Sequence, residues 1–258
     1  MNTPVKSRLG TADGASTEAR LRVELAGAYR LAHYYGWDEL IFNHITARVP
    51  GRERYFLIND YGLRYDEVRA SNLLKIDLEG RLVEGPADAM VNPAGFVIHS
   101  AIHTGREDIL CAMHTHTVAG AAVSAMECGL LPVTLESMLF TGCIGYHDFE
   151  GITVQEDEKP RLVKALGNNI ALILRNHGLL TVGRTVAEAF LRMFHLQRAC
   201  EVQVAALQAG VKLTLPPEEI QRRVVKQGES FETKKSPAQR PFEAMLRLMD
   251  RIDASYRT

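Results

Sequence analysis

The chain has 258 residues, of which 46% are hydrophobic and 24% are charged, and its formal net charge is −1. The length suits one large domain, and a net charge near zero gives no reason to expect nucleic acid or a membrane as a partner. The four cysteines form no C-x-x-C pair and lie in apolar stretches, so we expect buried thiols in a reducing compartment. The N-terminus lacks the apolar core of a secretory signal, and no apolar run could span a bilayer, so we expect a cytoplasmic protein.

The first part of the chain is predicted to contain an arm, a helix and two hairpins. We expect residues 1–16 to be a flexible arm and residues 17–35 to be an amphipathic helix that ends at Gly36. β-Branched and aromatic residues then predict two β-hairpins. Their strands are 40–49 with 54–59, and 73–78 with 81–85.

The middle of the chain is predicted to form a helix with capping residues at both ends, followed by a strand and a short helix. Asn92 is a suitable N-cap and Gly105 a suitable C-cap for a helix over 92–105. The apolar run 109–117 is typical of a strand, and the small residues 118–126 predict a short helix after it.

The last third is predicted to add another hairpin and the longest helix. Its elements are a short helix ending at Gly167, strands 169–175 and 179–183, a helix over 186–209, a polar linker over 226–241 and a short helix over 242–254. Thr185 and Glu188 have the spacing of a capping box at the start of the long helix. We therefore divide the chain into the arm (1–16), one main domain (17–225) and a C-terminal linker with a short helix (226–258).

The connections between the predicted strands indicate the fold class. Most adjacent strands are joined by short turns, which favours a mainly antiparallel or mixed sheet covered by helices over a doubly wound parallel sheet. No G-x-G-x-x-G follows a predicted strand, and no G-x-x-x-x-G-K-[ST] occurs. Binding of a dinucleotide or of nucleotide phosphates through these motifs is therefore poorly supported.

Two histidines stand one residue apart in the apolar run "CAMHTHT". On a strand His114 and His116 point to the same face, with Cβ atoms roughly 7 Å apart, so that both rings can bind one metal ion. A metal needs a third ligand, and His177, in an Asn-His-Gly turn between apolar strands, is the best candidate. The alternative for these residues is hydrogen bonding at a strand end. His99 and His103 form a rival i, i+4 pair, without the glutamate of H-E-x-x-H.

Six segments together resemble the class II aldolase and adducin family, from about residue 20 to residue 210. They are "GWDELIFNHITARV", "YGLRYDEV", "VNPAGFVIHSAIH", "MHTHTVAGAAVSAMECGLLP", "GYHDFEG" and "LRNHGLLTVG". The likeness is closest to the adducin head domain and its bacterial relatives. It implies a three-layer α/β/α fold with a mainly antiparallel central sheet, and homo-tetramers with active sites at subunit boundaries.

The resemblance also implies a metal centre and a small-molecule substrate. In the sugar-phosphate aldolases of the family three histidines bind zinc, and they match His114, His116 and His177. The metal stabilises an enediolate formed from the substrate, which is the work of a Lewis acid. The expected cofactor is therefore Zn²⁺, with Fe²⁺ and Mn²⁺ as alternatives that a three-histidine site also suits.

The chain departs from the aldolase pattern at three places. Gly95 stands where the aldolases have a glutamate that moves the proton. Their two phosphate-binding motifs are replaced by "NHIT" at 43–46 and by Pro-Ala at 93–94. Two residues are candidates to take over the acid–base role. They are His44, in the first replaced motif, and Glu136, near the point where a neighbouring subunit's tyrosine enters the aldolase site.

Four more residues could contribute to the site or could fix loops: Arg64, Tyr65, Tyr146 and His147. Three functions follow from these patterns. The first is a metal-dependent lyase-type enzyme that stabilises an enolate. The second is a catalytically silent, adducin-like interaction module. The third is a metal-dependent decarboxylase or oxygenase of the same fold.

Overall fold

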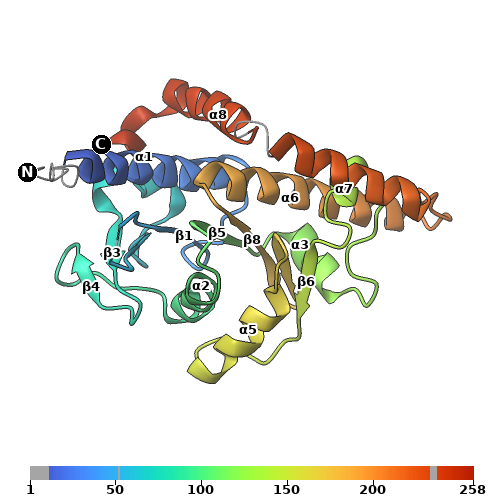
Figure 1. The fold of residues 1–258 in the computed structure, drawn as a ribbon, viewed down its shortest axis with the longest axis horizontal. Coiled ribbons are helices and arrows are strands. Elements are labelled where there is room, and N and C mark those ends of the chain that lie inside the picture. Colours follow the sequence, from blue (N-terminus) through green and yellow to red (C-terminus); the bar gives the residue numbers. More distant parts are fainter. Residues whose placement is uncertain (1–11, 52, 233–236) are drawn as a thin grey trace, which may run out of the picture.

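An eight-stranded sheet forms the middle layer of the molecule (Figure 1). The computed structural model describes residues 12–51, 53–232 and 237–258. The strand order is β4-β3-β2-β1-β5-β8-β7-β6; the β6–β7 pair is parallel and the other neighbouring pairs are antiparallel. The strands are β1 (His44–Arg48), β2 (Phe56–Ile58), β3 (Leu74–Ile76), β4 (Leu82–Glu84), β5 (Cys111–Thr115), β6 (Ile144–His147), β7 (Ala171–Leu174) and β8 (Gly178–Gly183). The predicted mainly antiparallel, mixed sheet is confirmed.

Helices cover both faces of this sheet, which gives the predicted α/β/α layers. In Figure 1, α1 and α6 lie above the sheet with α8 packed on them, and α2 and α5 lie below it. The helices are α1 (Ala12–Tyr34), α2 (Pro93–Gly105), α3 (Val118–Ala125), α4 (Leu135–Met138), α5 (Lys159–Leu166), α6 (Val186–Gln208), α7 (Glu218–Glu232) and α8 (Gln239–Ile252).

Strand β5 shows how the alternation of side chains builds two cores. Cys111 and Met113 belong to the apolar cluster formed with α1, α6 and α8. Ala112 points the other way, into the cluster formed with α2 and α5. Because side chains alternate along a strand, His114 shares the α2 face with Ala112. His114 therefore lies on the face of the sheet that α2 covers.

Two of the predicted boundaries are corrected. Helix α1 begins at Ala12, so residues 12–16 are helical, while residues 1–11 of the predicted arm lie outside the described part of the chain. Extending a helix whose buried face has already formed adds one hydrogen bond per residue at little cost. The predicted linker over 226–241 is helical over 226–232, because α7 starts at Glu218 and crosses the boundary placed at residue 225. Pairs of opposite charge at i and i+4, such as Glu218 with Arg222, stabilise this polar helix.

Smaller differences between prediction and structure concern two helix ends and the edge strand β6. Helix α2 runs through Gly105, and Arg106 caps it. The Thr185 side chain accepts a hydrogen bond from the Glu188 backbone, but the Glu188 carboxylate accepts from Arg184 rather than from Thr185, so the capping box is incomplete. Strand β6 was not predicted as a strand; it pairs in parallel with β7, through a connection that local turn signals do not reveal.

Candidate metal centre

Three histidines come together at one end of the sheet, where β5 ends and the β7–β8 hairpin turns. The ring centroid of His114 lies 4.5 Å from that of His116 and 4.8 Å from that of His177. The centroids of His116 and His177 lie 4.6 Å apart. One nitrogen from each ring lies within 4.8 Å of the others. The structure thus brings together the three residues that the sequence predicts to be metal ligands. Within the described ranges, no other group of three or more His, Cys, Asp or Glu side chains gathers in this way.

Strand register and a tight helix start place the first two rings. His114 pairs with His44 of β1 on one side and with Leu180 of β8 on the other. β5 ends at Thr115, so His116 lies one residue past the strand. Thr117 then caps α3 by accepting a hydrogen bond from the backbone N–H of Gly120. This cap turns the chain away directly after His116, and both rings remain at the strand end.

The third ring is placed by the turn between β7 and β8. Asn176 has a φ of 55°, a left-handed conformation that asparagine tolerates better than most residues. A Cβ on Gly178 would lie 2.3 Å from the Thr115 carbonyl oxygen. Glycine is therefore required where β8 starts against β5, and His177 is held beside His116 by this close approach.

The hydrogen bonds of the rings show that the site suits a cation. The Nδ1 atom of His114 lies 2.9 Å from the Leu179 carbonyl oxygen, and Nδ1 of His116 lies 2.6 Å from a Glu39 carboxylate oxygen. These oxygens are acceptors, so each ring places its proton on Nδ1 and leaves a lone pair on Nε2. The two Nε2 atoms are 2.7 Å apart. Two lone pairs at this distance repel each other unless a proton or a metal ion lies between them.

Burial keeps two of these rings neutral. Burial, followed by the neighbouring histidines, lowers the pKa of His114 well below its usual 6.5. Burial and His116 lower the pKa of His177 to about 4. A histidine binds a metal in its neutral form, so both rings are ready to act as ligands at neutral pH.

His44 occupies the space beside Gly95. Its ring centroid lies 5.4 Å from that of His114 and 4.3 Å from that of His99. A Cβ on Gly95 would come within 2.6 Å of the His44 ring, so a side chain at position 95 and the present His44 ring exclude each other. The Nε2 atom of His44 is buried and has no hydrogen-bond partner among the described residues. Burial lowers the pKa of His44 to about 3.

The rival pair on α2 has a different environment. The Thr46 hydroxyl lies 2.5 Å from Nδ1 of His99 and 2.8 Å from Nε2 of His103, so it bridges the two rings. Both rings are buried, and burial lowers the pKa of His103 to about 3. His44, His99, Thr46 and His103 thus form a buried polar row that begins beside His114. The sequence pattern did not reveal this row, because Thr46 comes from β1, more than fifty residues before His99 and His103.

Of the other candidate residues, His147 lies near the cluster, because it lines a small cavity together with His177. Helix α4 packs against α6 and α7, and Glu136 raises the pKa of His195 on α6, against the dominant effect of burial. The remaining four residues hold loops. Arg64 pairs with Asp66, Tyr65 packs on Tyr29, the Tyr146 hydroxyl accepts from the Leu130 backbone, and His147 contacts Glu158.

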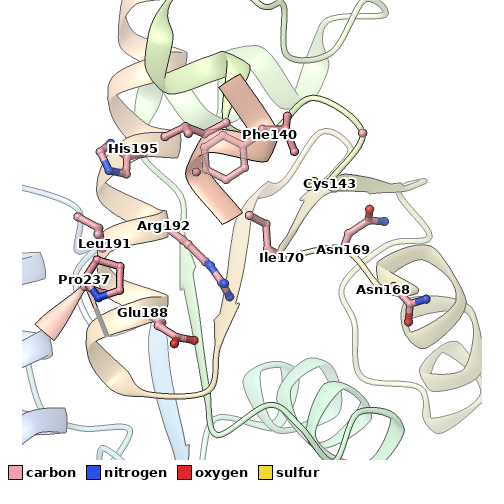
Figure 2. A pocket seen from close by; sticks show the side chains of 15 residues that line it. Phe140, Cys143, Asn168, Asn169, Ile170, Glu188, Leu191, Arg192, His195 and Pro237 are labelled. Carbon is pink, nitrogen blue, oxygen red and sulfur yellow. The ribbon is translucent and has the colours of Figure 1, made fainter. Parts of the chain in front are cut away.

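A cavity of about 490 Å³ lies elsewhere, between α6, α7 and the β6–β7 edge. Figure 2 shows Leu191, Arg192 and His195 of α6 on one side of it and Ile170 on the other. None of the three clustered histidines lines it. Imidazole nitrogens converge at the histidine cluster and not in this mainly apolar cavity, so the cluster is the candidate site.

Comparison with known proteins identifies the family. Residues 23–204 match the family model described as Class II Aldolase and Adducin N-terminal domain. The chain belongs to this family. A Caulobacter vibrioides protein that bears a provisional class 2 aldolase name is 48% identical over 87% of this chain and 86% of its own length. Alpha-adducin of Rattus norvegicus is 44% identical over the whole chain, which covers 37% of that protein.

Solved structures of the family confirm the fold. An aldolase II superfamily protein from Pseudomonas syringae superimposes with a TM-score of 0.90 at 42% identity, covering 97% of this chain and 98% of that chain. L-fuculose 1-phosphate aldolase from Glaciozyma antarctica gives a TM-score of 0.82 at 28% identity, covering 98% and 97%. In the described part of this family member, no helix combines the length and apolarity needed to cross a membrane.

The buried polar row predicts how stability depends on pH. The pKa of His103 is about 3 in the folded chain, below the 6.5 of an exposed histidine, so between these values the unfolded chain binds a proton that the folded chain does not. Its contribution is complete above about pH 6.5 and is lost as pH falls toward 3, at about 1.4 kcal/mol per pH unit. We expect His103→Gln to reduce the slope of unfolding free energy against pH by this amount, measured by urea unfolding with a chelator present. An unchanged slope would contradict the assignment.

Proposed function

We propose that this protein is a metal-dependent, lyase-type enzyme that stabilises an enolate of a small oxygenated substrate. The observation that carries the proposal is the close approach of the His114 and His116 Nε2 atoms, 2.7 Å apart, with both Nδ1 atoms directed at oxygen acceptors. A proton or a metal ion between the two Nε2 atoms would relieve the repulsion of their lone pairs, and we propose that a metal ion does so. Membership of a family that includes L-fuculose 1-phosphate aldolase adds support for metal-assisted carbon–carbon chemistry.

His114, His116 and His177 would hold the metal, which we take to be Zn²⁺ with Fe²⁺ and Mn²⁺ as alternatives. When bound, the ion supplies Lewis-acid chemistry: it polarises a substrate carbonyl and stabilises the negative charge of the enolate. The rings keep their orientation because His114 is buried at the end of β5 and because the Nδ1 protons of His114 and His116 are each held by an oxygen. This rigidity is what a catalytic centre requires.

His44 is the residue that we assign to proton movement. Gly95 offers no side chain, and the His44 ring fills the space directly beside it. Its buried Nε2 atom has no hydrogen-bond partner among the described residues, and we propose that it accepts a hydrogen from the substrate. Burial lowers the pKa of His44 and so keeps its ring neutral at neutral pH; the same shift makes the ring a weak base and its conjugate acid a strong proton donor.

The rest of the proposed picture concerns assembly and substrate. We propose a homo-tetramer in the cytoplasm, with each site completed at a subunit boundary, where Glu136 of one subunit would reach the histidines of the next. The replaced phosphate motifs favour a substrate without a phosphate group. Decarboxylation or oxygenation by the same centre remains an alternative reaction.

A catalytically silent module is the second candidate function. The specific observation in its favour is the similarity to alpha-adducin over the whole length of this chain, together with glycine at position 95. Such a module would keep the fold without needing any histidine to bind metal or move a proton. The two experiments below distinguish these functions.

The first experiment measures metal binding. We expect the purified protein to bind about one divalent ion per chain, and His114→Ala, His116→Ala and His177→Ala each to weaken Zn²⁺ binding by more than ~100-fold, because a direct ligand matters more than the surrounding residues. Calorimetric titration with Zn²⁺ and elemental analysis provide the measurement. His195→Ala, a half-buried histidine on α6, is the matched control and should bind normally. A wild type that stays metal-free after Zn²⁺ loading would overturn the proposed enzyme.

The second experiment follows proton exchange. With Zn²⁺ in D₂O, we expect exchange of the α-hydrogens of dihydroxyacetone or pyruvate, detected by proton NMR, and a decrease of roughly 10²–10⁴-fold in His44→Gln. Gly95→Ala should also slow exchange while preserving metal affinity, because its Cβ displaces the His44 ring. Gly62→Ala, where a Cβ meets nothing within 4 Å, is the control. Metal binding without exchange in these probes would favour the silent module, and full activity of His44→Gln would exclude His44 as the base.

A further inference from the structure

The segment 37–43, which joins α1 to β1, is held in a definite shape. Trp37 is 5% exposed and stacks on Tyr35 at 4.8 Å, which fixes the start of the segment. A turn closes where the Phe42 backbone N–H donates to the Glu39 carbonyl, at 3.0 Å. The Asn92 side chain donates to the Phe42 carbonyl and so fixes the end of the segment against α2. Both ends are therefore tied to buried elements.

Backbone strain lies at the centre of this turn. Leu40 has a φ of 52°, which a branched side chain rarely adopts, and 71% of its surface is exposed. Burial of the Leu40 side chain therefore does not compensate for the strain. Strain of this kind persists where the surrounding structure over-determines it, often beside functional sites. The strained Leu40 is preceded by Glu39, whose side chain contacts the histidine cluster.

The turn directs Glu39 at one of the three clustered histidines. A Glu39 carboxylate oxygen lies 2.6 Å from Nδ1 of His116, a residue 77 positions further along the chain. The Glu39 side chain is half exposed and that of His116 is 20% exposed, so the contact is at the mouth of the cluster. An ionised carboxylate has no proton to donate, so in this contact Glu39 accepts and the His116 ring donates from Nδ1.

We propose that Glu39 is a positioning residue for the metal centre, which holds the proton of His116 on Nδ1 and so directs its Nε2 lone pair toward His114 and the metal. This inference rests on the proposed three-histidine site and adds a residue to it. Leu179 performs the same task for His114 through a backbone carbonyl, which no substitution removes. Glu39 performs it through a side chain and adds a negative charge near the cation.

Two variants and a control test this role. Glu39→Ala removes the acceptor, and Glu39→Gln keeps an acceptor oxygen without the charge. Glu107→Ala removes another exposed carboxylate, one paired with Arg54 outside the cluster. The first measurement is the ¹⁵N NMR spectrum of the His116 ring in metal-free protein, which reports the tautomer. The second is Zn²⁺ affinity by competition with a chelating dye.

We expect Glu39→Ala to convert His116 from the Nδ1–H tautomer to a mixture and to weaken Zn²⁺ binding about 10–100-fold. Glu39→Gln should recover the tautomer and part of the affinity, and Glu107→Ala should change neither. An unchanged tautomer in Glu39→Ala overturns the proposal, even if thermal stability falls. The NMR measurement needs no metal, so it decides the role of Glu39 independently of whether the wild type binds Zn²⁺.

Discussion

The close approach of two imidazole rings at the end of β5 is the constraint on which the site depends. The Nε2 atoms of His114 and His116 face each other at 2.7 Å, while each Nδ1 is directed at an oxygen acceptor. Neutral rings in this arrangement repel each other, and a cation between them removes the repulsion. The sheet supplies the rigidity for His114, because β5 is fully buried and paired on both sides, and the Thr117 cap of α3 and the contact with Glu39 hold His116.

The contact between Gly95 of α2 and His44 of β1 distinguishes this site from that of the aldolases that the sequence resembles. In the aldolases that the sequence resembles, a glutamate enters at the position of Gly95. In this chain the His44 ring occupies the volume next to that glycine, and the rings of His99 and His103 continue the polar row behind it, linked by Thr46. The His44 ring can take this position only because residue 95 is a glycine. A change at either position alone produces a collision or a void, so the two residues act as one unit.

Periodicity and end signals predict the parts of this structure that depend on local sequence. The H-x-H spacing on a strand places two rings on one face, and the Asn-His-Gly turn places His177, so the histidine cluster follows from the sequence. Contacts between distant segments could not be predicted in this way. Glu39 meets His116 across 77 residues, Thr46 meets two helix residues, and β6 pairs in parallel with β7. Each depends on tertiary packing, which no local pattern encodes.

The central claim is that three histidine nitrogens bind one metal ion, and anomalous X-ray scattering from crystals soaked in Zn²⁺ tests it most directly. The account predicts one strong peak per chain at the zinc edge, bonded to Nε2 of His114, Nε2 of His116 and one ring nitrogen of His177. The absence of a peak at this place, or a zinc ion bound through the Nδ1 atoms of His114 and His116, would contradict it.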